Sequence, residues 1–288
     1  MASEPNPSDP PVVVSPQWAA AHRDEVLLAD VRWYLDGRSG RAAFREGHPP
    51  GAVFVDVDTD LAGPATGTGG RHPLPDPRDF AESMAALGIG DGTPVVAYDD
   101  SGGSTAARLV WMLRVLGSPA ALLDGGIGAW PGPLETGEDR PVHRRRTPAA
   151  WPADRVADTV GVSADTGDPR RLLLDARARE RYTGAEPAPV DPRPGHIPGA
   201  QSAAWPGNLT EDGRMAPPER LRERFRALGA DSAETITAYC GSGVTACHDL
   251  LALEHAGYTG ARLYPGSWSA WGADSGLPAE TGEGEGPA

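Results

Sequence analysis

Lysine is missing from this chain: its 288 residues include 26 basic side chains, and all of them are arginines. Schiff-base enzymes, pyridoxal-phosphate enzymes and P-loop proteins all need a lysine amine, so these three classes are excluded. Acidic residues outnumber basic ones by 40 to 26, and the longest basic run is Arg144 to Arg146. Because a phosphate backbone is bound by dense positive charge, the sequence predicts no nucleic-acid partner.

Long apolar runs are also missing. No uninterrupted run approaches the roughly 18 residues that mark a membrane span. Residues 1–11 lack the basic and apolar regions of a signal peptide. We therefore expect a cytoplasmic protein with no membrane partner.

Cysteine is scarce, since only Cys240 and Cys247 are present. Their spacing corresponds to about two helical turns, which is too far for a disulfide within one helix. Two cysteines are also too few for a structural zinc site. We expect free thiols, and the sequence predicts neither a metal nor a cofactor.

The second half of the chain repeats the first half in the same order. GHPPGA at 47–52 returns as GHIPGA at 195–200, and LADVR at 28–32 returns as LLDAR at 173–177. Three later matches share one offset of 141 residues, and a tandem duplication explains this order best. The predicted organisation is a disordered N-terminus (1–11), a first domain (12–131), a linker (132–158), a second domain (159–278) and a disordered tail (279–288).

Each copy alternates short apolar runs with helical patterns. Asp76 and Pro77 are typical of a helix start, and Gly88 is typical of a helix end. The expected strands are 94–98 and 235–239, and the further expected helices are 104–116, 217–228 and 245–256. This alternation predicts an α/β fold of two tandem domains, each a parallel sheet with helices on both faces. Ligand sites in such sheets lie past the carboxyl ends of the strands.

Residues present in both copies are most simply explained by the shared fold. His48 and His196 occupy the same GHxPGA turn, and we expect both to brace their loops. Asp30 and Asp175 each end an apolar strand two residues before an arginine. This placement favours a role in supporting the backbone.

Cys240 occurs in one copy alone, because the first copy has Asp99 at the equivalent place. It follows a predicted strand and opens the loop CGSGVT, which leads into a predicted helix. Loop N–H groups and a helix N-terminus stabilise an anion, so this setting favours the nucleophilic thiolate. Cys247, inside the following helix, is expected to be buried and inert.

Two other kinds of nucleophile chemistry fit this loop poorly. A cysteine phosphatase needs an arginine as the sixth residue after the cysteine, where this chain has Ala246. A protease-like triad needs a partnered histidine, and the nearest one, His248, is expected on a solvated helix face. The small, nearly neutral loop suits a compact ligand such as a single sulfur atom on the thiol.

From about Val12 to Leu277, the chain resembles a tandem-domain rhodanese. The resemblance rests on CGSGVTA at 240–246, which is similar to the loop of the 3-mercaptopyruvate sulfurtransferase branch, and on GHIPGA at 195–200. It implies an inactive first domain, a catalytic second domain and a site at their interface. In this family a thiolate takes a sulfane sulfur from a small-molecule donor and becomes a persulfide. The sulfur then passes to a thiol, thioredoxin or cyanide, which implies double-displacement kinetics.

The resemblance also implies roles for individual residues. Cys240 would be the nucleophile, and Ser242 would work with His72 and Asp58 as a proton relay for the leaving pyruvate enolate. Arg181 matches the family arginine that binds the carboxylate or sulfonate of the donor, a role suited to a planar guanidinium. The other loop residues expected to contact the substrate are Gly241, Gly243, Val244 and Thr245.

One position departs from the 3-mercaptopyruvate pattern. Val190 stands where those enzymes carry a second substrate arginine, and Arg193 is the nearest arginine that could replace it. Thiosulfate enzymes also lack that arginine, but they usually carry basic residues where this chain has Gly241 and Ser242. The sequence therefore predicts a 3-mercaptopyruvate sulfurtransferase first. The alternatives are a thiosulfate:cyanide sulfurtransferase and, third, a non-catalytic rhodanese scaffold or sulfur-carrier partner. The preferred donor, the acceptor, the oligomeric state and any redox role of Cys247 stay open.

Overall fold

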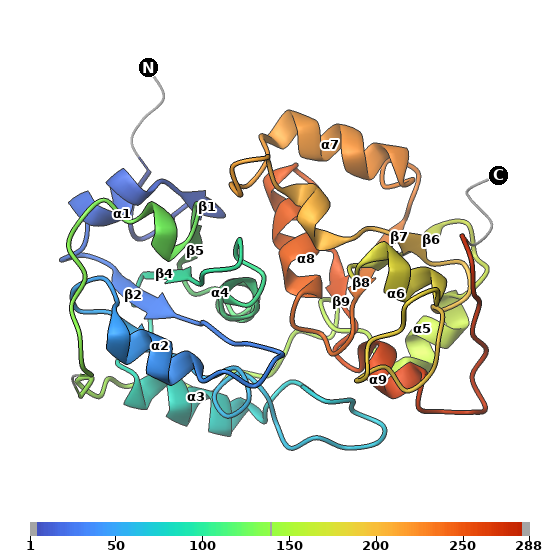
Figure 1. Ribbon diagram of the computed structural model, residues 1–288, viewed down its shortest axis with the longest axis horizontal. Helices are drawn as coiled ribbons and strands as arrows, with labels where there is room; N and C mark the ends of the chain where they lie inside the picture. Colours follow the sequence, from blue (N-terminus) through green and yellow to red (C-terminus); the bar gives the residue numbers. More distant parts are fainter. Residues whose placement is uncertain (1–4, 139, 284–288) are drawn as a thin grey trace. The chain divides into compact units, whose positions relative to one another are not determined.

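The structure, a computed structural model, describes residues 5–138 and 140–283 (Figure 1). The chain forms two compact units. The first contains the chain through Gly63, Pro75–Trp151 and Glu211–Met215, and the second contains Pro64–Leu74, Pro152–Thr210 and the chain from Ala216. Each unit therefore includes a short segment from the other half of the sequence, which the repeat alone does not predict.

The first unit holds a five-stranded parallel sheet in the order β1-β5-β4-β2-β3. Asp76 caps α3 by accepting a hydrogen bond from the N–H of Arg78, and Pro77 is the first helical residue. The elements of this unit are β1 (Val13–Val14), α1 (Pro16–Ala21), β2 (Leu27–Asp30), α2 (Gly40–Glu46), β3 (Val53–Phe54), α3 (Pro77–Ala86), β4 (Val95–Tyr98), α4 (Ala106–Val115), β5 (Ala120–Leu123) and the 3-10 helix η1 (Ile127–Ala129).

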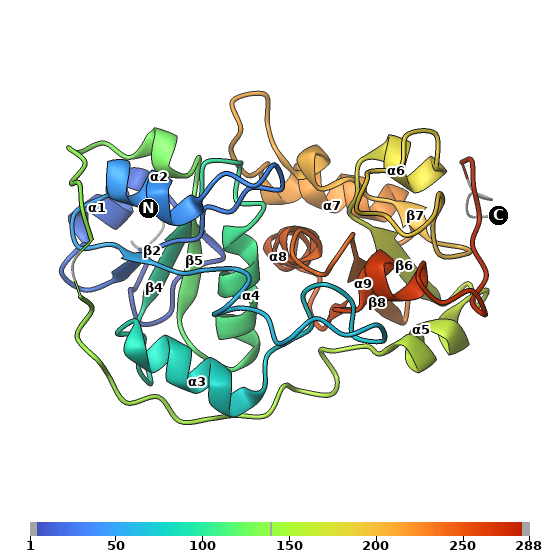
Figure 2. The ribbon, with the colours of Figure 1, turned by 60° about the horizontal axis from the view of Figure 1, so that its bottom comes forward.

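Helices cover both faces of this sheet. Trp18 of α1 belongs to one buried cluster with Leu28, Val96 and Leu123, which share one face of the sheet. Alternate strand residues point to the opposite face, where α4 packs along β4 and β5 (Figure 2).

The second unit repeats this architecture with a parallel sheet in the order β7-β6-β8-β9. Val156 forms a parallel bridge with Leu263 of β9 and so takes the place that β1 has in the first sheet. The predicted parallel α/β fold is confirmed. The elements of this unit are α5 (Thr159–Asp165), β6 (Arg171–Asp175), α6 (Arg179–Thr183), β7 (Gln201–Ser202), the 3-10 helix η2 (Trp205–Asn208), α7 (Pro218–Ala227), β8 (Thr235–Tyr239), α8 (Ala246–His255), β9 (Arg262–Leu263) and α9 (Ser267–Trp271).

The paired Asp and Arg residues of the two copies support the backbone in the same way. Arg32 Nη2 lies 2.6 Å from Asp30 Oδ2 and donates to the first carbonyl of the GHxPGA turn at 2.8 Å. Arg177 makes the same contacts with Asp175 and its own turn, also at 2.6 and 2.8 Å. All four side chains are buried, so each pair fixes a turn rather than acting on a ligand.

The two turn histidines are equivalent as well. His48 stacks on Phe44 with ring centroids 4.0 Å apart, and its Nδ1 lies 2.8 Å from the Phe44 carbonyl oxygen. His196 stacks on Tyr182 at 3.7 Å, and its Nδ1 lies 2.9 Å from the Tyr182 carbonyl oxygen. Both histidines therefore have the bracing role that the sequence predicts.

The described residues of the segment 132–158 contain no helix or strand, and part of the segment runs along the first unit (Figure 2). The N–H of Arg144 donates to the Ala85 carbonyl at 3.0 Å, and Trp151 Nε1 donates to the Pro75 carbonyl at 2.8 Å. Backbone pairing of this kind fixes a segment that has no apolar periodicity of its own.

Parts of both predicted disordered ends are held by hydrogen bonds. Trp18 Nε1 donates to the Pro5 carbonyl at 3.0 Å. Glu280 pairs with His196 through two backbone hydrogen bonds of 2.9 and 3.0 Å. The remaining residues of these ends, 1–4 and 284–288, lie outside the described residues. Within the described ranges, no helix has the length and apolar character needed to cross a membrane.

Candidate active site

Cys240 directly follows the central strand β8, at the carboxyl edge of the second sheet. Its thiol is almost fully buried, and Sγ accepts a hydrogen bond from the N–H of Gly243 at 3.1 Å. The loop then enters α8 at Ala246, so the start of this helix lies close to the sulfur in sequence. Backbone donors of this kind stabilise a negatively charged sulfur.

The start of α9 holds this loop in place. The N–H of Cys240 donates to Ser267 Oγ at 3.2 Å, while the N–H of Trp268 donates to the Cys240 carbonyl at 2.9 Å. Ser267 has a φ of +52°, a conformation that is uncommon for a residue with a side chain. Its hydroxyl donates to the Tyr264 carbonyl at 2.8 Å, which offsets part of the backbone strain.

In the first unit, the same strand–loop–helix arrangement binds the carboxylate of a side chain, Asp99. The Asp99 carboxylate is fully buried and accepts four backbone hydrogen bonds of 2.8 to 2.9 Å. Their donors are Ser101, Gly103, Thr105 and Ala106. This loop therefore concentrates N–H groups on the position that Cys240 occupies in the second copy.

Replacing Asp99 tests how strongly the first loop depends on its anion. We expect Asp99→Ala to lower the free energy of unfolding by about 3 kcal/mol or more, because it leaves several buried N–H groups without an acceptor. The neighbouring Asp100→Ala, at an exposed position, should cost less than about 1 kcal/mol. Urea unfolding of both variants measures the difference, and equal losses would contradict this account of the loop.

The predicted pair Ser242 and His72 meets in the second unit, because Pro64–Leu74 belongs to that unit. Ser242 Oγ lies 2.7 Å from His72 Nδ1, and both side chains are buried. Asp58 belongs to the first unit, where its Oδ2 accepts a hydrogen bond of 2.9 Å from Trp33 Nε1.

The guanidinium group of Arg181 lies close to Gly241 in the Cys240 loop, and it forms an ion pair with Asp191. Its Nε and Nη2 donate to the buried Asp191 carboxylate at 2.8 and 2.5 Å. Burial alone would raise the pKa of Asp191, but the hydrogen bonds and charge of Arg181, with the charge of Arg177, hold this pKa below its usual range. A Cβ built on Gly241 would lie 3.0 Å from Arg181 Nη2, so a glycine here leaves room for the guanidinium.

Arg71 is a site residue that the sequence reasoning missed. The same Cβ on Gly241 would lie 3.2 Å from Arg71 Nη2, and Arg71 Nη1 donates to the Val190 carbonyl at 2.8 Å. The one available signal was the position of Arg71 directly before His72. Its approach to the loop depends on how the segment 64–74 packs, which local patterns do not report.

Two expectations about nearby residues need correction. Arg193, considered as a substitute for the missing arginine, donates from Nη2 to the backbone carbonyls of α9 and the chain after it, most closely to Leu277 at 2.7 Å. His248 is fully buried rather than solvated, because its face of α8 packs against η2. Its ring lies 5.2 Å from that of Trp205, and its Nδ1 lies 3.2 Å from Asn208 Nδ2.

The neighbouring Asp249 is a buried acid whose protonation changes near neutral pH. Its Oδ1 accepts from Asn208 Nδ2 at 2.6 Å, while Oδ2 has no hydrogen-bond partner in the described part of the chain. Burial raises the pKa of Asp249 from 3.8 to about 7; Arg224 and Asn208 oppose this shift, and Asp175 adds to it.

This raised pKa predicts that the protein loses stability as the pH rises from acidic to neutral. The folded state holds the Asp249 proton more tightly than the unfolded chain, so the free energy of unfolding should fall between pH 4 and 7, by up to about 4 kcal/mol, and then level off. Asp249→Asn keeps an acceptor for Asn208 and removes the titration, so it should flatten this fall and be the more stable protein at pH 8.

Urea unfolding at pH 5 and pH 8 measures this effect. Asp154→Asn, at an exposed position, is the matched control and should keep the wild-type pH dependence. An Asp249→Asn protein that is less stable than the wild type at pH 8, and that has the same pH dependence, would refute the expected energetic cost of ionising Asp249.

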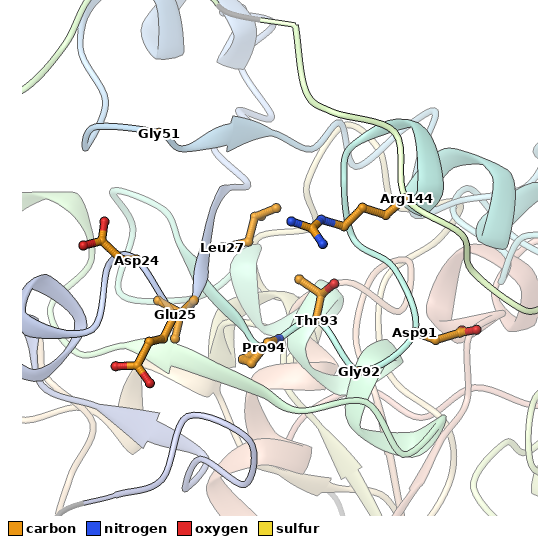
Figure 3. A pocket seen from close by; sticks show the side chains of 10 residues that line it. Asp24, Glu25, Leu27, Gly51, Asp91, Gly92, Thr93, Pro94 and Arg144 are labelled. Atoms are coloured by element: carbon orange, nitrogen blue, oxygen red, sulfur yellow. The ribbon is translucent and has the colours of Figure 1, made fainter.

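The molecule also has shallow pockets away from Cys240. One, of about 440 Å³, lies in the first unit at the amino ends of β2 and β4, with Leu27 and Pro94 among its lining residues. Figure 3 shows the carboxylates of Asp24, Glu25 and Asp91 and the guanidinium of Arg144 around it. The carboxyl edge, where ligands of parallel sheets bind, is the opposite one. Among the described residues, no group of three or more His, Cys, Asp and Glu side chains could hold a metal ion.

Comparison with known proteins assigns the class. The family described as Rhodanese-like domain matches residues 15–132 and 160–274. A "Probable 3-mercaptopyruvate sulfurtransferase" of Pseudomonas aeruginosa is 45% identical over 269 residues, which cover 90% of this chain and 93% of that protein. A "Putative thiosulfate sulfurtransferase SseB" of Mycobacterium tuberculosis is 37% identical over 266 residues, 90% of this chain and 92% of that protein. The crystal structure of SseA from Escherichia coli, one of the 3-mercaptopyruvate sulfotransferases, has a TM-score of 0.77 and 31% identity to this chain, and the match covers 90% of this chain and 99% of that one.

The chain therefore belongs to the rhodanese family and carries two rhodanese-like domains. It is an enzyme, a sulfurtransferase. The predicted family, fold class and enzyme class are confirmed.

Proposed function

We propose that this enzyme takes a sulfur atom from 3-mercaptopyruvate onto Cys240 and passes it to a thiol acceptor. The observation that carries the proposal is the 2.7 Å contact between Ser242 Oγ and His72 Nδ1, in the loop that begins with Cys240. The Ser242–His72 pair can transfer a proton. Whether the reaction needs such a transfer depends on which sulfur donor the enzyme uses.

The first half-reaction with 3-mercaptopyruvate produces a carbanion equivalent. The Cys240 thiolate attacks the donor sulfur and forms an S–S bond, while the C–S bond breaks and its electron pair goes to the pyruvate enolate. The enolate then needs a proton at carbon, and Ser242 with His72 can deliver it. Asp58 is proposed as the third member of this relay.

The second half-reaction restores the enzyme. A thiolate of the acceptor attacks the outer sulfur of the Cys240 persulfide, the S–S bond breaks, and its electron pair returns to Cys240. The loop residues 241–245 would surround both the thiolate and the persulfide, and Arg181 would bind the donor carboxylate. A thioredoxin-like protein is the proposed acceptor class, which fits a reducing compartment such as the cytoplasm.

Thiosulfate is the alternative donor. Its outer sulfur would transfer to Cys240 while the S–S electron pair leaves on sulfite, a stable anion that needs no protonation to depart. A thiosulfate enzyme therefore gains nothing from the Ser242–His72 pair, whereas Val190, in place of a second arginine, fits thiosulfate better. The proton-moving pair favours 3-mercaptopyruvate because it meets a chemical requirement of that donor alone.

Steady-state kinetics with both donors test the proposal. We expect kcat/KM for 3-mercaptopyruvate to exceed that for thiosulfate by about tenfold or more, with the parallel-line pattern of double displacement. The variant Val190→Arg adds the second arginine and should raise kcat/KM for 3-mercaptopyruvate further. A higher kcat/KM for thiosulfate would support the alternative, and no turnover with either donor would support a non-catalytic role.

A further inference from the structure

We infer that the segment 280–283 positions Arg181 for the sulfur donor, an inference that rests on the proposed function and adds positioning residues to it. The segment contacts both parts of the chain that carry the Arg181–Asp191 ion pair. One part is the short helix α6, which carries Arg181. The other is the turn that begins at Gly195, which follows the loop that carries Asp191.

The helix that carries Arg181 is too short to hold its own position. α6 has five residues, and a helix of this length is not stable without tertiary contacts. The segment supplies such contacts, because the N–H of Gly282 donates to the Thr183 carbonyl at 2.8 Å and Glu283 forms an ion pair with Arg179. The first contact satisfies a carbonyl in the last turn, where a helix offers no partner of its own.

The same segment holds the turn that follows Asp191. Glu280 pairs with His196 through two backbone hydrogen bonds of 2.9 and 3.0 Å, and Glu280 Oε2 accepts from the N–H of Gly199 at 3.2 Å. Gly195 has a φ of +100°, and a Cβ there would lie 2.1 Å from the Glu280 carbonyl oxygen. A glycine is therefore required for this close approach, which fixes the turn against the segment.

Arg177 connects this turn to the ion pair. Its Nη2 donates to the Gly195 carbonyl at 2.8 Å, and its Nη1 lies 3.9 Å from Asp191 Oδ1. Asp191 accepts two hydrogen bonds from Arg181, at 2.8 and 2.5 Å. The side chains of Arg177 and Asp191 are each 1% exposed. Because buried side chains are closely packed, a shift of the turn would move Asp191 and, with it, the Arg181 guanidinium.

The first unit contains an equivalent segment, 135–138. Glu135 pairs with His48 through two backbone hydrogen bonds of 2.8 and 3.0 Å, and the N–H of Gly137 donates to the Arg45 carbonyl at 2.9 Å, near the end of α2. The last residue of this segment also forms ion pairs with α2. Holding a helix and the following turn together is therefore a property of the shared fold.

The two copies differ in what lies between the helix and the turn. Arg45 and His48 are three positions apart, whereas Thr183 and His196 are 13 positions apart, so the second copy has ten additional residues. Asp191 is one of them. Closing a longer loop costs more conformational entropy, so its ends need to be held together. In the second unit the segment closes the base of this added loop, and the contacts of the shared fold thereby position the ion pair.

Two matched proline variants separate this role from a merely structural one. Gly282→Pro removes the N–H that donates to Thr183 and cannot adopt the φ of +83° at this position, so it releases α6 from the segment. Gly137→Pro makes the same change in the first unit, where φ is +94°. We expect similar losses of stability in urea unfolding. Gly282→Pro should raise KM for the preferred donor about five- to tenfold, and Gly137→Pro should leave this KM unchanged.

A truncation removes the segment completely. A variant that ends at Pro278 should raise KM for the donor about tenfold or more with kcat changed less than about threefold, because an anchor binds ground state and transition state alike. A variant that ends at Glu283 keeps all the contacts of the segment and should match the wild type. Equal KM values for the two proline variants, or an unchanged KM after truncation at Pro278, would overturn the inference.

A binding measurement distinguishes failure of this inference from failure of the proposed function. Calorimetry with thiosulfate as the probe compares Cys240→Ser with the double variant Cys240→Ser/Gly282→Pro, in which no sulfur can transfer. We expect about fivefold weaker binding in the double variant, because its arginine is less well positioned before the anion binds. Equal binding by the two proteins, or no binding by Cys240→Ser, would overturn the role of the segment. Absence of turnover in the wild type would refute the proposed function alone.

Discussion

Cys240→Ser is expected to abolish sulfur transfer from both donors, with kcat/KM reduced by about four orders of magnitude or more. A serine hydroxyl cannot form the S–S bond that stores the transferred sulfur, so both half-reactions lose their intermediate. The measurement is the release of pyruvate from 3-mercaptopyruvate and of sulfite from thiosulfate under identical conditions.

Cys247→Ser is the matched control for this loss. Cys247 is also buried, but its thiol donates to the Gly243 carbonyl at 3.4 Å and so stabilises the loop from the helix side. We expect this variant to keep its activity within about tenfold of the wild type, because a serine hydroxyl can make the same hydrogen bond. If Cys247 were essential and Cys240 dispensable, the assignment of the nucleophile would be wrong.

Ser242→Ala and His72→Gln are expected to impair one donor and spare the other. Loss of a positioned proton donor lowers the rate of a reaction about 10²- to 10⁴-fold, so the turnover of 3-mercaptopyruvate should fall by that factor in both variants. Thiosulfate turnover should fall less than about tenfold, because sulfite leaves without taking a proton. The ratio of the two kcat/KM values is the diagnostic quantity, since misfolding would lower kcat/KM for both donors together.

Two comparisons make this result interpretable. His143→Gln, at an exposed position, should leave both donors unchanged. The double variant Ser242→Ala/His72→Gln should lose little more than either single variant, because residues that act as one unit are not additive. Equal losses for both donors would show that the pair supports the loop rather than moving a proton.

The sequence predicts the fold well because the duplication supplies two independent records of it. The strand expected at 235–239 is β8 with those bounds, and the helix expected at 217–228 is α7, Pro218–Ala227. The place of Cys240 at the end of a strand follows from the same local signals. The loop and the helix N-terminus predicted a setting that favours an anion, and the first-copy counterpart Asp99 is a carboxylate that accepts four backbone N–H hydrogen bonds in the same place.

The rest of the site depends on contacts that local patterns do not contain. His72 and Ser242 are 170 positions apart, and the resemblance to a family, not their spacing, suggested them. Arg71 and Ser267 were missed, because their roles depend on how the segment 64–74 and the start of α9 pack against the Cys240 loop. The burial of His248 was missed for a similar reason, since η2 covers it from a distant part of the chain.

The most direct test of the account is the mass of the intact protein after incubation with 3-mercaptopyruvate and removal of the excess donor. We predict the gain of one sulfur atom, which peptide mapping places on Cys240, and its loss when a thiol is added. An unchanged mass, or an added sulfur that maps to Cys247, would contradict the claim that Cys240 carries the transferred sulfur.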